Sequence, residues 1–205
     1  MKNEAGKNMN QYKPEGTLIK SYQNIEYISS KKGLEKALEK QVILEAPVIM
    51  CDHNFNLHIS LCSGVHGIIP REEVQYSEDE QIKDIAILTR VGGEVFAILS
   101  RKSAQRECIL NYIETLECGD IIPTKITHLE NFGAFADIGC GIVALLSIDS
   151  ISVSRISHPS ARLCVGDFIY TVVKNIDEHG RIFISERELL GSWEENAALF
   201  SEGQT

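Results

Sequence analysis

Two phenylalanines separated by a Gly-Ala pair carry the clearest chemical signal in this sequence. Phe132 and Phe135 lie in the segment FGAF, and exposed aromatic rings can stack on nucleobases, which stabilises binding by about 1–3 kcal/mol per base. Residues three apart on a regular strand point to opposite faces. The two rings therefore share a surface only if Gly133 distorts the strand or Phe132 lies at its mouth. The alternative is that one ring belongs to the hydrophobic core.

Four charged residues are further candidates for contact with a nucleic acid, and the three cations among them could bind a phosphate backbone. Asp177 and Arg181 flank a tight turn, and the planar guanidinium of Arg181 can donate two parallel hydrogen bonds to a phosphate or a base. The alternative is a turn-capping aspartate followed by an exposed arginine, which any hairpin can carry. Lys125 and Lys174 fall on predicted strands and could neutralise phosphates, although single lysines also commonly face solvent.

Four side chains that can bind zinc occur between residues 51 and 62: Cys51, His53, His58 and Cys62. Their spacing is not a common structural zinc pattern, and the segment is typical of two strands joined by a turn. Strand alternation alone can place these residue types there. We therefore predict no metal and no cofactor.

Motifs of the common enzyme classes are missing from the sequence. It has no glycine-rich phosphate loop, no GxSxG, no HExxH and no CxxC. The adjacent pairs Glu72-Glu73 and Glu194-Glu195 lie in polar segments and are typical of solvated faces or helix caps. We therefore expect a protein without enzymatic activity.

The composition narrows the class of protein further. The chain has 205 residues, of which 43% are hydrophobic, and a net charge of −9. A chain of this length can form one or two globular domains, but it is too acidic for a generic polyphosphate binder. No apolar run approaches the roughly 18 residues that span a bilayer, the first ten residues lack the apolar stretch of a secretory signal, and six sparse cysteines indicate reduced thiols. We expect a cytoplasmic protein without a membrane partner.

The elements that must position the candidate residues lie in the C-terminal half. Five strands with one long connection predict a small Greek-key barrel, and the chain order favours no βαβ unit. An amphipathic helix over 103–117, with Ser103 as its expected N-cap, precedes the barrel, and a capping box predicts a further helix from Ser192 to about Phe200. The strands are predicted at 120–128, 132–138, 142–147, 168–176 and 181–185.

An earlier block has a related pattern. At an offset of 77, residues 55–70 align with residues 132–147, which suggests a tandem repeat of one barrel unit. The stretch from 92 to 100 is much shorter than the matching stretch from 166 to 185, so we predict that the first copy has lost most of a strand pair. Its strands are predicted at 42–51, 55–62, 64–70, 85–90 and 95–100, after a helix at 33–40.

Residues 118–190 resemble the RNA-binding domain of the ribosomal protein S-one family, an oligonucleotide-binding (OB-fold) barrel. The resemblance rests on four features in order: Gly119-Asp120, Phe132-Gly133-Ala134-Phe135, Val165-Gly166-Asp167, and Asp177 with Gly180-Arg181 before Ile184-Ser185. It implies that the phenylalanines, Asp177 and Arg181 contact single-stranded RNA. Ser147 stands where the family often has a histidine, and the segment carries 6 basic against 9 acidic side chains. We therefore expect modest, weakly salt-dependent affinity from this domain.

The first block resembles the degenerate leading repeat of the same family. His58 takes the position of Phe135, Asn56 takes that of Gly133, and the short hairpin has no counterpart of Asp177 and Arg181. We predict that this block does not bind RNA strongly. The resemblance implies docking to the ribosome through protein contacts, and a spacer role without any partner is equally open.

The predicted fold is all-β dominated: tandem five-stranded OB-fold barrels, the first degenerate, with short linking helices. We predict an RNA-binding protein that holds single-stranded RNA or mRNA at or near the small ribosomal subunit in translation. The alternatives are a protein-interaction module that docks on the ribosome or another ribonucleoprotein without contacting RNA, or an appendage of a larger enzyme. The expected divisions are a flexible arm (1–32), the degenerate barrel (33–102), a linker helix (103–117), the complete barrel (118–190), and a linker helix with the start of a truncated next repeat (191–205).

Overall fold

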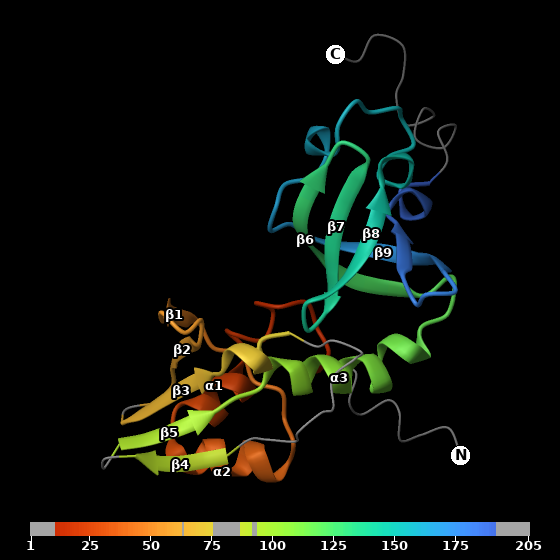
Figure 1. The fold of residues 1–205 in the computed structure, drawn as a ribbon. Coiled ribbons are helices and arrows are strands. Elements are labelled where there is room, and N and C mark those ends of the chain that lie inside the picture. The colour runs from red at the N-terminus through yellow and green to blue at the C-terminus, as the bar shows by residue number, and fades with distance from the viewer. Residues whose placement is uncertain (1–10, 63, 76–86, 92–93, 192–205) are drawn as a thin grey trace, which may run out of the picture. The chain divides into compact units, whose positions relative to one another are not determined.

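The computed structural model describes residues 11–62, 64–75, 87–91 and 94–191 (Figure 1). The chain divides into two compact units, Met1–Glu114 and Thr115–Thr205. Among the described residues, no helix combines the length and the apolar character that crossing a membrane requires. The helix expected near residues 192–200 lies outside the described residues.

An open five-stranded sheet forms the centre of the first unit (Figure 1). Its strand order is β1-β2-β3-β5-β4, with β3 and β5 parallel and the other neighbours antiparallel. The strands are β1 Val48–Cys51, β2 Leu57–Ser60, β3 Val65–Ile69, β4 Ile87–Val91 and β5 Glu94–Ile98. The described helices of this unit are α1 Tyr22–Ile28, α2 Lys31–Glu39 and α3 Arg101–Asn111.

The N-terminal segment of this unit is ordered by side-chain contacts that leave no periodic signal in the sequence. Tyr12 is buried, and its ring stacks on that of Tyr112 with the centroids 6.3 Å apart. The Glu45 carboxylate accepts backbone hydrogen bonds from Gly16, Leu18 and Ile19 at 2.8–3.1 Å. Burial raises the pKa of Glu45, although these hydrogen bonds oppose the shift. Helix α1 therefore forms where the sequence pattern predicts a loose arm.

Strand β1 is shorter than the strand predicted over 42–51. The Asn24 side chain bonds the backbone of Glu45 on both sides, donating to its carbonyl at 2.7 Å and accepting from its N–H at 2.9 Å. Those groups are no longer available to a β-ladder, and Pro47 has no N–H to offer. The strand accordingly begins at Val48.

Helix α3 begins at Arg101, two residues before the predicted start. Its N-cap is Ser100, which is extended (φ −129°) and whose hydroxyl accepts a hydrogen bond from the backbone N–H of Ser103 at 2.9 Å. The prediction of Ser103 as the cap is wrong, because Ser103 lies inside the first turn as the donor rather than the acceptor.

A closed five-stranded barrel forms the second unit, and this confirms the predicted OB-type fold class. The strands are β6 Ile121–Glu130, β7 Gly133–Gly139, β8 Ile142–Ser147, β9 Phe168–Ile176 and β10 Ile182–Ser185. They run in the order β10-β8-β7-β6-β9, and a ladder between β9 and β10 completes the ring. The most deeply buried core side chains alternate along these strands and include Ile126, Ala134, Ala136, Leu146, Val173 and Ile184.

The two sheets have the same strand order, but only the barrel is closed. Strand β6 has ten residues, so that residues 121–125 pair with β9 while residues 125–130 pair with β7. Strand β1 has four residues and pairs with β2 alone among the described strands. The prediction that the first copy has lost most of a strand pair is wrong. Strands β4 and β5 pair along residues 87–91 and 94–98, and the described sheet lacks the closing ladder instead.

Candidate nucleic-acid interface

The turn between β6 and β7 places Phe132 at the mouth of strand β7. Its side chain is 55% exposed, and its carbonyl accepts a hydrogen bond from the N–H of Ile148 at 2.9 Å. A Cβ at Gly133 would overlap the backbone carbonyl oxygen of Leu146, so only glycine lets β7 approach β8 this closely. The glycine thus allows the chain to turn into the barrel directly after an exposed phenylalanine.

Phe132 and Phe135 lie on one surface, as their candidate role requires. Their ring centroids are 6.0 Å apart and the rings are nearly perpendicular, at 86°. Phe135 is half-buried, and its other neighbour is the imidazole of His128, 6.4 Å away and inclined by 24°. The three rings form a continuous aromatic cluster, which we call the Phe132–Phe135–His128 cluster.

His128 reaches this cluster through an irregularity in β6. The register shifts between Ile126 and His128, so that His128 lies opposite Phe135. In a regular strand, His128 would share the inward face of Ile126, which is fully buried. His128 is instead exposed, and its Nε2 lies 2.8 Å from the Glu130 carboxylate. Alternation alone gives no sign of this residue.

A row of partly buried side chains continues the cluster across the barrel. Phe135 pairs with Leu145 on β8, Leu145 with Phe183 on β10, and Phe183 with Asn175 on β9. Directly paired residues share a sheet face, and the neighbours Ala134, Leu146 and Ile184 fill the interior. Phe183 therefore faces outward, a position that the alternation in RIFIS could have indicated.

Asp177 and Arg181 form a tight ion pair at the β9–β10 turn. Nε of Arg181 donates to the Asp177 carboxylate at 2.7 Å, and the backbone N–H groups of His179 and Arg181 donate to the same carboxylate at 2.9 and 2.8 Å. Desolvation raises the pKa of Asp177, but these hydrogen bonds outweigh it and hold the pKa below its ordinary value. The Arg181 side chain remains 70% exposed.

The two candidate lysines occupy different surroundings. Nζ of Lys174 lies 3.3 Å from the hydroxyl of Ser150, to which the Ser147 hydroxyl also donates at 2.9 Å. Lys174 is thus joined to Ser147, at the end of β8 that pairs with Gly133. Lys125 lies over the Phe168 ring, 5.4 Å from its centroid, and pairs in register with Asp137 and Phe168. Lys174 is therefore linked through two serines to the aromatic end of the face, whereas Lys125 lies over Phe168.

The matching surface of the first unit has a different composition. Phe55, the counterpart of Phe132, is 61% exposed, and the Arg71 guanidinium lies 5.2 Å from its ring centroid. His58 replaces the second phenylalanine, and its Nε2 lies 3.1 Å from the Asp52 carboxylate. Hydrogen bonds from the Asn56 backbone, and others from Asn56, His58 and Asn54, lower the pKa of Asp52 despite some desolvation.

None of these groups forms a metal centre within the part of the chain that the structure describes. No three His, Cys, Asp or Glu side chains gather there closely enough to hold a metal ion. His58, one of the four zinc-compatible residues, has the Asp52 carboxylate as its neighbour instead.

Comparison with known families decides the nature of the barrel. Residues 115–187 match the S1 RNA binding domain family. The match is to this part of the chain, which we refer to below as the S1 domain. The resemblance to the S-one family predicted for residues 118–190 is therefore confirmed, and the S1 domain coincides with the barrel that carries Phe132, Phe135 and Arg181.

Curated relatives fall into two groups. The chain is 33% identical over 132 residues to small ribosomal subunit protein bS1 of Synechococcus elongatus, covering 62% of this chain and 43% of that protein. It is 34% identical over 96 residues to polyribonucleotide nucleotidyltransferase of Persephonella marina, covering 46% of this chain and 14% of that protein. The chain thus spans less than half the length of either relative.

Among solved structures, the chain is similar to GSP13 from Bacillus subtilis, with a TM-score of 0.36 and 23% identity. The match covers 44% of this chain and 65% of that one.

Proposed function

We propose that this chain binds single-stranded RNA on the outer face of the S1 domain. The observation that carries the proposal is the exposed, perpendicular pair of Phe132 and Phe135, with ring centroids 6.0 Å apart. A base can stack on the free face of Phe132, while the neighbouring ring limits where that base sits. The outward row through Leu145 and Phe183 gives the following bases an apolar surface.

The charged candidates support the same face. Arg181 is held through Nε by Asp177 while its side chain stays 70% exposed, so its Nη groups can donate to phosphate or base edges. Lys174 supplies a second cation near Phe132, beside hydroxyls at the position where the family often has a histidine. With few cations in a segment of 6 basic and 9 acidic side chains, binding is modest and depends weakly on salt.

Fluorescence anisotropy with single-stranded oligoribonucleotides tests this proposal. Phe132→Ala should weaken binding by between about fivefold and 100-fold, because one base loses its stacking partner. Phe168→Ala is the matched control, since Phe168 is an equally exposed phenylalanine of the same barrel that lies beside Lys125. Equal affinities of the two variants would place the RNA elsewhere, and absence of binding at about 100 μM protein in low salt would reject RNA binding itself.

The cellular role that fits this binding is in translation. Relatives named as small ribosomal subunit proteins match most of this chain, which supports a place at or near the small subunit in the cytoplasm. The chain shares only 14% of the length of the nucleotidyltransferase relative, so we assign it RNA binding without catalysis. RNA co-purified with the chain from cells should be enriched in mRNA.

The first unit favours a second function, protein docking. Strand β1 lies at the edge of an open sheet and exposes Val48, Ile49 and Met50 by 50–61%. An apolar edge strand with unpaired backbone groups is suited to pairing with a protein partner. Affinity capture from ribonuclease-treated extract tests this function: ribosomal or ribonucleoprotein partners that persist without RNA support it, and their loss on RNA removal rejects it.

A further inference from the structure

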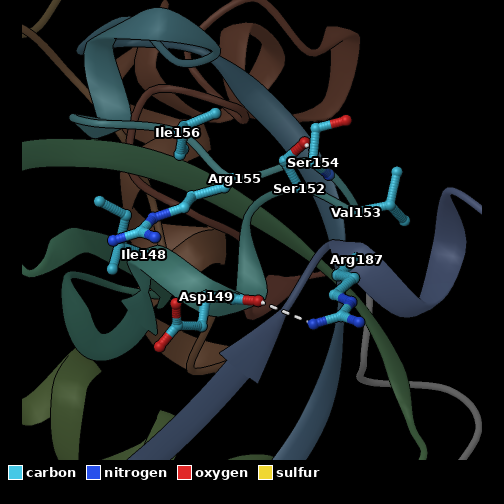
Figure 2. Close-up of a pocket in the computed structure, with 8 residues that line it drawn as sticks. All are labelled: Ile148, Asp149, Ser152, Val153, Ser154, Arg155, Ile156 and Arg187. Carbon is cyan, nitrogen blue, oxygen red and sulfur yellow. Dashed lines mark hydrogen bonds between the residues drawn. The ribbon is translucent and has the colours of Figure 1, made fainter. Parts of the chain in front are cut away.

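A pocket lies next to the aromatic face, in the long connection between β8 and β9. Its volume is about 480 Å³, within the range of about 300–1,000 Å³ in which proteins bind small molecules. The 3-10 turn η5 (Ile148–Ser150), residues 152–156 and Arg187 line it (Figure 2). Nη1 of Arg187 donates a long hydrogen bond, 3.5 Å, to the carbonyl of Asp149.

Ile148, the first residue of η5, connects this pocket to the Phe132–Phe135–His128 cluster. The N–H of Ile148, which lines the pocket, donates to the carbonyl of Phe132 at 2.9 Å. Ser150, two residues further on, contacts Lys174 through its hydroxyl. Ile148 thus connects the pocket to the backbone of Phe132, so an RNA strand stacked on Phe132 can reach the pocket across η5.

The side chains of the pocket suit an anionic, partly polar ligand. Arg155 and Arg187 are both exposed, and in Figure 2 their guanidinium groups lie on either side of Asp149. The lining also contains Ser152 and Ser154, while Asp149 is its one acidic residue. The pocket thus has a positive balance within a domain whose balance is negative. Paired guanidinium groups are the usual means of holding phosphate oxygens.

We propose that this pocket holds a nucleotide of the same RNA strand, adjacent to the nucleotide stacked on Phe132. Arg155 and Arg187 bind its phosphates, the exposed Ser154 faces its sugar, and Ile148 contacts its base. The proposal rests on the proposed function, because the strand is delivered by the aromatic face. It lengthens the RNA footprint of the S1 domain beyond the sheet and assigns a role to two of its six basic residues.

Salt-titrated binding of the full chain to a single-stranded oligoribonucleotide of about ten nucleotides tests the pocket, since one OB fold covers about 4–16 nucleotides. Arg155→Gln and Arg187→Gln should each make the negative slope of log K against log salt shallower by about 0.7. The double variant should bind RNA about tenfold more weakly. Arg162→Gln is the matched control, because Arg162 is an exposed arginine of the same domain outside the pocket. It removes the same charge and should leave the slope unchanged.

The outcomes separate this proposal from the proposed function. If Phe132→Ala weakens binding while Arg155→Gln and Arg187→Gln behave like Arg162→Gln, the pocket proposal is wrong and the aromatic face remains. If all three arginine variants lower affinity equally, only net charge matters and the pocket proposal is again wrong. If the wild-type chain does not bind RNA, both proposals are rejected together.

Discussion

At the scale of single residues, the aromatic face depends on the glycine that follows Phe132. The Phe132 ring can be exposed and Ala134 fully buried within two residues because Gly133 has no side chain to meet the Leu146 carbonyl. The sequence allowed the two rings to share a surface if Phe132 lies at the mouth of a strand. The structure has this arrangement. The aromatic pair was thus predictable from residue type and spacing.

Gly133→Ala tests this dependence. The added Cβ would overlap backbone atoms that cannot rotate away, so we expect the S1 domain to lose about 3 kcal/mol of unfolding free energy. Gly119→Ala is the comparison, because Gly119 has a positive φ (+100°) but open space around its Cβ, and it should cost about 1 kcal/mol. Urea denaturation followed by Phe and Tyr signals measures both. Equal losses would mean that the positive φ, rather than the close approach of β7 to β8, is the reason for glycine at position 133.

Asp177 gives the S1 domain a defined acid sensitivity. Its folded pKa lies below its unfolded value, so its stabilising contribution is present above the unfolded pKa of about 3.9 and is lost as pH falls through the folded pKa. The melting temperature should therefore fall as the pH is lowered below about 4, and Asp177→Asn should reduce that fall. Thermal melts of both proteins at several pH values check this. Parallel pH profiles for the two proteins would contradict the assigned hydrogen bonds.

Other residues of the face could not be predicted from the sequence. His128 reaches Phe135 only because the register of β6 shifts after Ile126, and a bulge has no fixed residue signature here. Lys125 lies on a strand of the same barrel, yet its ammonium group lies over the ring of Phe168. Spacing identifies which strand carries a residue, but the bulges and twist of a closed barrel determine which neighbours it meets.

At the scale of elements, uninterrupted alternation was a reliable guide. The strands 142–147 and 168–176 were predicted with the bounds that β8 and β9 have. Prediction failed where side chains form hydrogen bonds with backbone groups. The Asn24 side chain binds the backbone of Glu45 and shortens β1, and Ser100 rather than Ser103 caps α3. Such local hydrogen bonds leave no period in the sequence, so only the three-dimensional structure reveals them.

Ser100→Ala tests the position of the α3 cap. Loss of the hydroxyl leaves the Ser103 N–H without its acceptor and should lower the unfolding free energy of the first unit by about 1 kcal/mol. Ser103→Ala keeps that backbone hydrogen bond and removes only the hydroxyl contact between the two serines, so it should cost less. Urea denaturation distinguishes the variants. A larger loss for Ser103→Ala would mean that Ser103, not Ser100, is the N-cap of α3.

At the scale of the whole molecule, two sheets with one strand order have diverged in closure and in surface. The S1 domain is a closed barrel with an aromatic pair and a paired arginine, whereas the first unit is open among its described strands and has His58 beside Asp52 in place of the second ring. The offset of 77 residues predicted two copies of one unit, and the matching strand order of the two sheets agrees with that prediction. The loss of closure depends on the length of β1, which the pattern overestimated. The net charge of −9 is compatible with RNA binding because the cations involved are few and local.

The central claim is that RNA binds on the aromatic face of the S1 domain rather than through overall charge. The most direct test is a salt-titrated RNA-binding isotherm of the full chain and its Phe132→Ala and Phe55→Ala variants. Binding on the aromatic face should give a slope of log K against log salt no steeper than about −3, a loss of at least about fivefold for Phe132→Ala, and a change within about twofold for Phe55→Ala. A steep slope with equal affinities for all three proteins would contradict it.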